Sequence, residues 1–258
     1  MSGSVTNVIA DSPDAMRLSA ATCAWCDAPL ARAATGAAGA HRCPSCGSRT
    51  EAWPSDAELA ALLSQAPGGA PTGRRCAAAE ALRRRARQRL AERVARSAPP
   101  GAVLDVGSGD GTLLDALRAA GRVATGIGRP STRADVHDVE ITEVGGRYAA
   151  IVFWQSLGRV SAPRTALEHA AALLKPDGLL TIAQPTPLAL PALTERWRGI
   201  AAPAQRIRIP QRALVERLRA LGLEVTHADR MREGSGTRPS AWSATLLGGV
   251  VSVEARRS

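Results

Sequence analysis

Several features are scarce or missing in this chain of 258 residues, and each of them weighs against a class of function. Aromatic side chains make up 3% of the sequence, which leaves few rings for a surface on which nucleic-acid bases could stack. No apolar run is long enough to cross a membrane. The first ten residues lack the basic stretch and apolar core of a signal peptide, so we expect a cytoplasmic protein with reduced cysteines.

Positive charge comes almost entirely from arginine. Lys175 is the only lysine, yet the formal net charge is +10. Many of the arginines fall in residues 74–97, whose composition predicts a helix with a thin apolar stripe. We interpret it as a packing helix with a solvated charged face, and a phosphate-binding surface is the alternative. The net charge allows a nucleic-acid or acidic partner without identifying one.

Four of the five cysteines form two Cys-x-x-Cys pairs, Cys23–Cys26 and Cys43–Cys46, with sixteen residues between them. Each pair can place two thiolates on one turn, and two such turns complete the tetrahedral site of a zinc ribbon, with Cys23, Cys26, Cys43 and Cys46 as ligands. Four thiolates leave no open coordination position, so we expect a structural zinc. A redox pair or unrelated buried thiols are the alternatives.

The sequence divides into four segments. Residues 1–20 are expected to be loosely ordered, and residues 21–53 to form the zinc ribbon. Residues 54–75 contain a short helix, predicted from a Ser-Asp-Ala-Glu capping box, and a linker rich in glycine and proline. Residues 76–258 then form the large domain.

A strand, a glycine turn and a helix follow one another in residues 103–121. The apolar run Val103–Val106 predicts a buried strand, and the turn after it has Gly107, Gly109 and Gly111 at every second position. Such a turn lets a ligand approach bare backbone and directs N–H groups and a helix N-terminus toward it. No Gly-Lys-Ser/Thr follows, so this is not a P-loop. A glycine-rich turn without a ligand is the alternative.

The order Asp-x-Gly-x-Gly-x-Gly, starting at Asp105, resembles motif I of class I S-adenosylmethionine (SAM) methyltransferases. The resemblance implies an α/β fold with a Rossmann-like sheet and flanking helices, and SAM as the cofactor. It also implies that Asp138 contacts the adenine amino group, for which an exposed strand-end acid is an equal alternative. The expected cofactor-binding residues are Asp105, Gly107, Ser108, Gly109, Gly111, Gly128, Asp138 and Gln155.

A narrower resemblance, to a bacterial subgroup of these enzymes with an N-terminal zinc ribbon, covers residues 98–230 and the cysteine pairs. That subgroup commonly has Trp-His-x-Leu-Glu-His where this chain has Trp-Gln-Ser-Leu-Gly-Arg, and the segment 197–210 resembles another of its motifs. The framework positions agree, but most ionisable positions do not. The departures are Gly128, where the family usually has an acid for the ribose hydroxyls, and Gln155, Gly158, Arg159, Gln205 and Arg208.

Apolar periodicity predicts the remaining elements of the large domain. The expected strands are 123–127, 136–141, 148–154, 179–183 and one beginning at 223, and the expected helices are 163–173 and 210–221. The segment after residue 127 is too short for a full helix. Residues 244–253 predict a hairpin at the edge of the sheet.

The chemistry of methyl transfer limits what the site needs. Displacement at a sulfonium depends mainly on alignment of the reactants, and a base is needed only where the nucleophile holds its proton. None of the four histidines falls where this fold would place a base. We therefore expect catalysis by positioning, with Gln155, Arg159 and Arg208 facing an acidic substrate.

Three functions are consistent with these residues. The first is a SAM-dependent methyltransferase acting on a small molecule, in a biosynthetic pathway. The second is a catalytically degenerate methyltransferase-like protein, a pseudoenzyme that serves as structural or regulatory partner of an active paralogue, because the substituted positions share one theme. The third is an RNA methyltransferase, which the net charge favours and the scarce aromatics disfavour.

Overall fold

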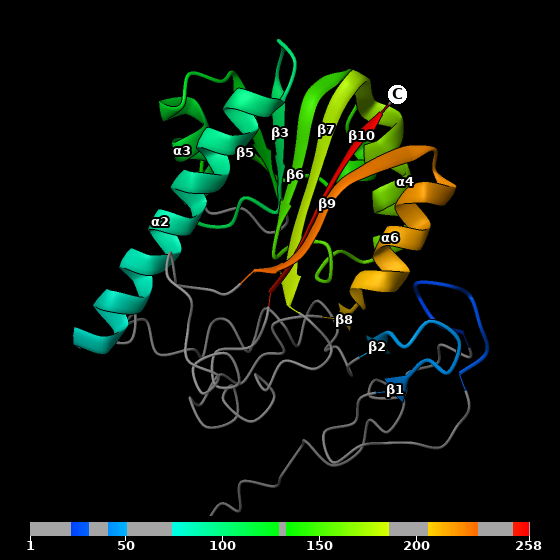
Figure 1. The fold of residues 1–258 in the computed structure, drawn as a ribbon. Coiled ribbons are helices and arrows are strands. Elements are labelled where there is room, and N and C mark those ends of the chain that lie inside the picture. The colour runs from blue at the N-terminus through cyan, green and yellow to red at the C-terminus, as the bar shows by residue number, and fades with distance from the viewer. Residues whose placement is uncertain are drawn as a thin grey trace, which may run out of the picture.

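The computed structural model describes residues 22–30, 41–50, 74–128, 133–185, 206–231 and 250–257 (Figure 1). These residues form a seven-stranded sheet in the order β5-β4-β3-β6-β7-β10-β9 and a small three-stranded sheet in the order β1-β2-β8. In this part of the chain, no helix is both long and apolar enough to cross a membrane.

The large sheet is parallel from β5 to β7, and β10 runs antiparallel to both of its neighbours. Its strands are β3 (Val103–Val106), β4 (Ala124–Ile127), β5 (Val136–His137), β6 (Tyr148–Trp154), β7 (Leu174–Pro185), β9 (Leu223–Met231) and β10 (Val250–Arg257). The central strands β3 and β6 consist mostly of fully buried apolar residues, as expected for a sheet covered on both faces.

Two pairs of helices cover the sheet, one pair on each face (Figure 1). The helices are α2 (Arg74–Ser97), α3 (Thr112–Ala119), α4 (Pro163–Leu173), α6 (Gln211–Ala220) and the short 3₁₀ helix η1 (Ile141–Glu143). On one face, Leu90 and Val94 of α2 pack with Leu114 of α3. On the other, Leu167 of α4 and Leu214 of α6 belong to the second core cluster.

Most elements predicted from periodicity are confirmed, with three corrections. The strand predicted over 136–141 ends at His137, and η1 begins at Ile141. Strand β7 begins at Leu174 rather than at 179. The last strand, β10, lies between β7 and β9 and not at the edge of the sheet, which explains why Val253 and Ala255 are fully buried. The helix and linker are predicted for residues 54–75; residues 54–73 lie outside the described residues, as do residues 244–249, and α2 begins at Arg74.

Candidate active site and metal centre

A cavity of about 470 Å³ opens at the carboxyl ends of β3, β4, β5 and β6. Parallel α/β sheets bind ligands at this edge, where the strand order reverses, here between β3 and β6. The expected residues in its wall are Asp105, Gly107, Ser108, Gly109, Gly128, Gln155 and Arg159. The structure therefore brings together seven residues that the sequence supplies from three separate segments.

Asp105 places a carboxyl group deep in this cavity. It occupies β3 and is 1% exposed, and its Oδ2 atom has no hydrogen-bond partner among the described residues. Burial raises the pKa of Asp105 to about 7, against the opposing effects of the Ser108 hydroxyl and the positive charge of Arg87. A buried carboxyl oxygen without a donor, beside a cavity, suits a cationic ligand group.

The glycine turn after β3 has two different reasons for its glycines. Gly107 has a φ of +74°, and a Cβ atom there would lie 2.4 Å from the Cβ of Ser156, so a side chain would collide with the β6–α4 loop. Gly109 has a φ of +54°, but a Cβ there would have only the carbonyl of Gly107 nearby, at 3.9 Å. Gly109 thus leaves bare backbone facing the cavity, whereas Gly107 allows the glycine turn to pack closely against Ser156 in the cavity wall.

Gly111 and Asp138 are the two expected cofactor residues that do not line the cavity. Gly111 precedes α3 with a φ of +73°, and the guanidinium of Arg133 covers the position where its side chain would project. Asp138 follows β5, and its neighbours Val139 and Glu140 lie in the wall instead.

Three ionisable wall residues, Arg87, Asp110 and Glu140, are not among the site residues predicted from the sequence. Arg87 Nη1 lies 3.4 Å from Asp110 Oδ2, and the N–H of Thr112 donates to Asp110 Oδ1 at 3.0 Å. The sequence analysis assigns the charges of residues 74–97 to a solvated face, but Arg87 stands three residues before Leu90 and seven before Val94, on the buried stripe of α2. That spacing was the available signal that Arg87 points inward.

The end of β4 and the start of η1 form another part of the cavity wall. Gly128 has an ordinary backbone conformation, and a Cβ there would contact the Cα of Gly107 at 3.4 Å, so the site can accept a side chain. Glu140 caps η1: its carboxylate accepts the N–H of Glu143, and its own N–H donates to Glu143 Oε1 at 2.9 Å. The Glu-x-x-Glu spacing at 140–143 was the sequence signal for this cap.

The loop between β6 and α4 completes the wall. Gln155 has a φ of +55°, a conformation that costs roughly 1–2 kcal/mol for a residue with a side chain and that often marks functional sites. Its N–H donates to the carbonyl of Ala183 in β7 at 2.6 Å, which holds the turn in place. Arg159 lies at the exposed side of the wall, where the surrounding protein reduces its hydration and lowers its pKa.

Arg208, the third residue expected to face a substrate, lies elsewhere. It belongs to β8 (Ile207–Arg208), is 3% exposed and does not line the cavity. Its backbone belongs to the small sheet, where it pairs with Arg49 of β2 (Arg49–Thr50). Gln205, another of the departures from the subgroup, lies outside the described residues.

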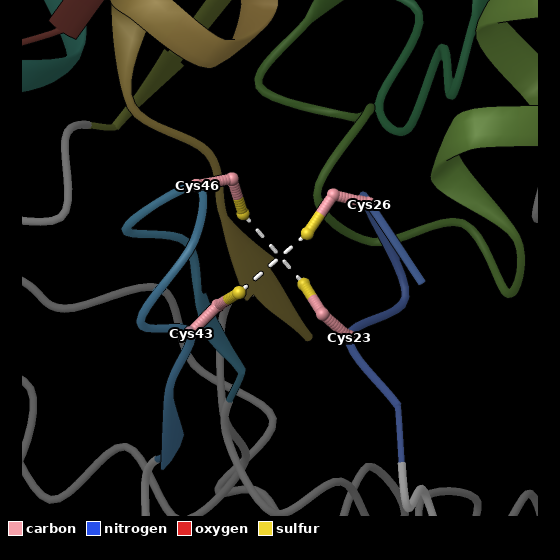
Figure 2. Close-up of side chains that lie close together, drawn as sticks. All are labelled: Cys23, Cys26, Cys43 and Cys46. Carbon is pink, nitrogen blue, oxygen red and sulfur yellow. Dashed lines mark hydrogen bonds between the residues drawn. The ribbon is translucent and has the colours of Figure 1, made fainter. Parts of the chain in front are cut away.

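The four cysteines of the two pairs converge on one point (Figure 2). All four sulfur atoms lie within 4.8 Å of one another, with Cys23 and Cys46 at 3.7 Å and Cys26 and Cys43 at 3.5 Å. A tetrahedral zinc ion with Zn–S bonds of about 2.3 Å would separate its sulfur ligands by about 3.8 Å. The donor set and the spacing therefore fit the structural zinc expected from the sequence.

The two cysteine turns have the same backbone geometry. The N–H of Asp27 donates to the carbonyl of Cys23, and the N–H of Gly47 donates to the carbonyl of Cys43. Asp27 and Gly47 both have positive φ, at 60° and 74°. Burial raises the pKa of Cys23; at Cys43 it acts in the same sense, but hydrogen bonds from the backbone at Cys46 and from other groups outweigh it and lower the pKa to about 7.

The small sheet joins the cysteine turns to the large domain. Strands β1 (His41–Arg42) and β2 (Arg49–Thr50) belong to the cysteine region. The third strand, β8, comes from a segment more than 150 residues later in the sequence and pairs with β2 (Figure 1). Trp25 is 4% exposed and belongs to the same core cluster as residues of the large sheet. An ion pair between Asp27 and Arg164 of α4 adds a polar contact. We refer to residues 22–30 and 41–50 together as the ribbon.

Comparison with known proteins agrees with this architecture. Magnesium protoporphyrin IX methyltransferase from Synechocystis PCC 6803, solved with bound S-adenosylhomocysteine (SAH), is 14% identical to this chain. Its TM-score is 0.53 over 79% of this chain and 96% of that one. The 1,6-didemethyltoxoflavin-N1-methyltransferase of Burkholderia thailandensis is 19% identical, with a TM-score of 0.50 over 79% of this chain and 91% of that one.

At these identities the likeness establishes the fold, a Rossmann-like class I methyltransferase sheet. No curated protein matches the sequence. The model of a family described as a methyltransferase domain matches residues 78–228, more than half of the chain. The protein therefore belongs to the methyltransferase-domain family.

Proposed function

We propose that this protein binds SAM and transfers its methyl group to a small molecule. The observation that carries the proposal is the unpaired Oδ2 of buried Asp105, next to the bare backbone of Gly109. Asp105 would accept hydrogen bonds from the ammonium group of SAM, and the positive charge of Arg87 would attract the carboxylate group of SAM. When bound, SAM supplies an electrophilic methyl group on a sulfonium.

The acceptor side of the cavity supports transfer by alignment. The wall residues include no histidine, lysine, cysteine or tyrosine among those described, so the base-forming side chains are Asp105, Asp110 and Glu140. Asp110 already pairs with Arg87, and Glu140 caps η1. We infer that the acceptor atom reacts without a dedicated protein base, and that Gln155 and Arg159 orient an acidic acceptor.

A small-molecule acceptor is also in keeping with the two structural neighbours, whose names describe methyltransferases of a porphyrin and of a toxoflavin precursor. The main competing function is that of a degenerate partner of an active paralogue, which Gly128 favours because it removes the carboxylate expected for the ribose hydroxyls. An RNA substrate is the third candidate, supported by exposed arginines at positions 84, 85, 89 and 96 of α2.

Calorimetric titration of the zinc-loaded protein with SAM and with SAH tests the proposal. We expect micromolar binding that Asp105→Asn abolishes. The matched control is Asp177→Asn, which removes the same charge from an exposed residue at the opposite end of the parallel strands, with a positive φ that asparagine tolerates.

No binding up to millimolar concentration would reject the proposal and favour the degenerate partner. If binding is found, transfer of a labelled methyl group into a small-molecule extract or into RNA separates the first function from the third. Steep loss of RNA affinity with salt would support the third.

A further inference from the structure

One wall of the cofactor cavity is hydrogen-bonded to β8, the strand that pairs with β2 of the ribbon. The carbonyl of Gly158 accepts two backbone hydrogen bonds, from the N–H of Arg206 at 2.7 Å and from the N–H of Ile207 at 3.1 Å. Gly158 stands in the β6–α4 loop between Ser156 and Arg159, both of which line the cavity. The start of β8 is therefore fixed directly to the cavity wall.

The other side of β8 is paired with the ribbon. Thr50 of β2 lies opposite Ile207, and Arg49 lies opposite Arg208, in an antiparallel ladder. Ile207 and Leu157 of the wall loop are buried in the same core cluster as Trp25. Contacts thus run without interruption from the ribbon through β8 and Gly158 to the cavity.

The ribbon cannot hold this arrangement by its own apolar core. Its two described segments have strands of two residues each, and modules below about 40 residues usually need a metal or disulfides to fold. Binding of a structural metal is then the folding free energy of such a module. The position of β2, and with it the support for β8, depends on the metal held by the four cysteines.

We propose that the ribbon is a positioning element of the cofactor cavity. Zinc bound by the cysteines fixes β2 and β8, and the N–H groups of Arg206 and Ile207 then hold Gly158 so that Gln155 and Arg159 stand in the wall. Occupancy of the zinc site and of the cofactor cavity, whose centres lie on different segments of the chain, is thereby coupled. The proposal rests on SAM being the ligand of the cavity.

Coupling between two sites is reciprocal, and this gives a measurement that a merely structural ribbon would not produce. SAH affinity is measured by calorimetry on the full chain, loaded with zinc and stripped by a chelator. We expect stripping to weaken SAH binding by about 5- to 150-fold, the usual range of such coupling. Zinc affinity, measured by competition with a chromophoric chelator, should rise by the same factor when SAH is saturating.

A pair of variants separates the hydrogen bond from the metal. Arg206→Pro removes the N–H that donates to Gly158, whereas Arg206→Ala keeps it, and both leave the four cysteines intact. We expect Arg206→Pro to bind zinc normally but to bind SAH at least several-fold more weakly than Arg206→Ala. SAH should also raise its zinc affinity by a smaller factor, because only the N–H of Ile207 still donates to Gly158. Arg206→Ala is the reference for this comparison, because both variants lack the arginine side chain and differ in the backbone N–H.

Equal SAH affinity in loaded and stripped protein, with an unchanged far-ultraviolet circular dichroism spectrum, would overturn the proposal. If stripping unfolds the chain, the Arg206 pair decides, and identical SAH binding by the two variants overturns it. If no form binds SAH, the proposed function fails instead. Hydrogen exchange at the Arg206 and Ile207 amides then tests the positioning: faster exchange without zinc supports it, and unchanged exchange rejects it.

Discussion

The ribbon and the cofactor cavity were both located from residue spacing, but they differ in how completely spacing specifies them. In the ribbon, four residues of one type complete the site, and the structure brings all four sulfurs together. In the cavity, the framework of Asp105, Gly107 and Gly109 is present while Gly128 and Gln155 depart from the family pattern. A closed metal site is defined by its ligands alone, whereas a cavity takes its chemistry from several strand ends.

The largest expected effect tests the closed site. Cys43→Ser removes one ligand of four and should abolish stoichiometric zinc, because structural zinc contributes about 10–16 kcal/mol of binding free energy in small modules. Zinc content and hydrogen exchange are the measurements. We expect protection to be lost in residues 41–50 and kept in β6 and β7.

Cys76→Ser is the matched control, since Cys76 lies in α2 and belongs to neither Cys-x-x-Cys pair. It should keep one zinc ion per chain. Full zinc retention by Cys43→Ser would show that the cluster does not act as a four-thiolate site.

The next effect tests the deepest residue of the cavity by its pH dependence. Burial raises the pKa of Asp105 from 3.8 to about 7, so its ionisation opposes folding. The stability is fully present below pH 4, falls as the pH rises toward 7, and is lost above it, by about 4 kcal/mol in all. Asp105→Asn removes this loss, so its stability relative to the wild type should increase from pH 4 to pH 8.

Denaturant unfolding at several pH values measures this difference, with Asp177→Asn as control. A constant difference across the range would show that Asp105 titrates normally. The same group links the proposed binding to pH. Asp105 would bind the ammonium group of SAM as the carboxylate, so SAM affinity should fall below pH 7, with proton release on binding near that pH.

A pair of glycine substitutions separates the two roles of the turn. Gly107→Ala adds a collision with Ser156 to an unfavourable φ, and we expect it to lower the free energy of unfolding by about 2–5 kcal/mol. Gly109→Ala meets no atom closer than 3.9 Å and should cost only about 1–2 kcal/mol while blocking the ligand. Denaturant unfolding and SAH calorimetry on both variants check this; equal stabilities would contradict the packing role of Gly107.

The sequence predicted local structure well because apolar spacing reflects burial directly. The bounds of β6 and α4 agree with the structure, and Arg87 could have been placed by the same reasoning, since it shares the stripe of Leu90. The place of β10 inside the sheet, and the pairing of β8 with the ribbon, depend on contacts between segments far apart in the chain. No local period encodes such contacts.

A smaller effect tests whether the cavity is one carboxylate short of the family pattern. Gly128→Asp should fit, because a Cβ there meets only ordinary contacts, and should strengthen SAH binding. A charged hydrogen bond contributes about 1.5–3 kcal/mol, so we expect roughly a 10- to 150-fold gain. Gly128→Asn, of equal size without charge, is the control for calorimetry. An unchanged affinity in both variants would show that position 128 does not face the ribose.

The smallest expected effect concerns the ion pair between the ribbon and α4 of the large domain. Asp27→Asn breaks the ion pair with Arg164, but Asp27 is 69% exposed, and exposed pairs contribute about 0–1 kcal/mol. Asparagine also tolerates the positive φ at this position, so zinc content and the thermal midpoint should barely change. Trp25→Ala, which removes a buried contact instead, should cost about 3–5 kcal/mol. A larger loss in Asp27→Asn than in Trp25→Ala would mean that charge, rather than apolar packing and the β2–β8 ladder, holds the ribbon against the large domain.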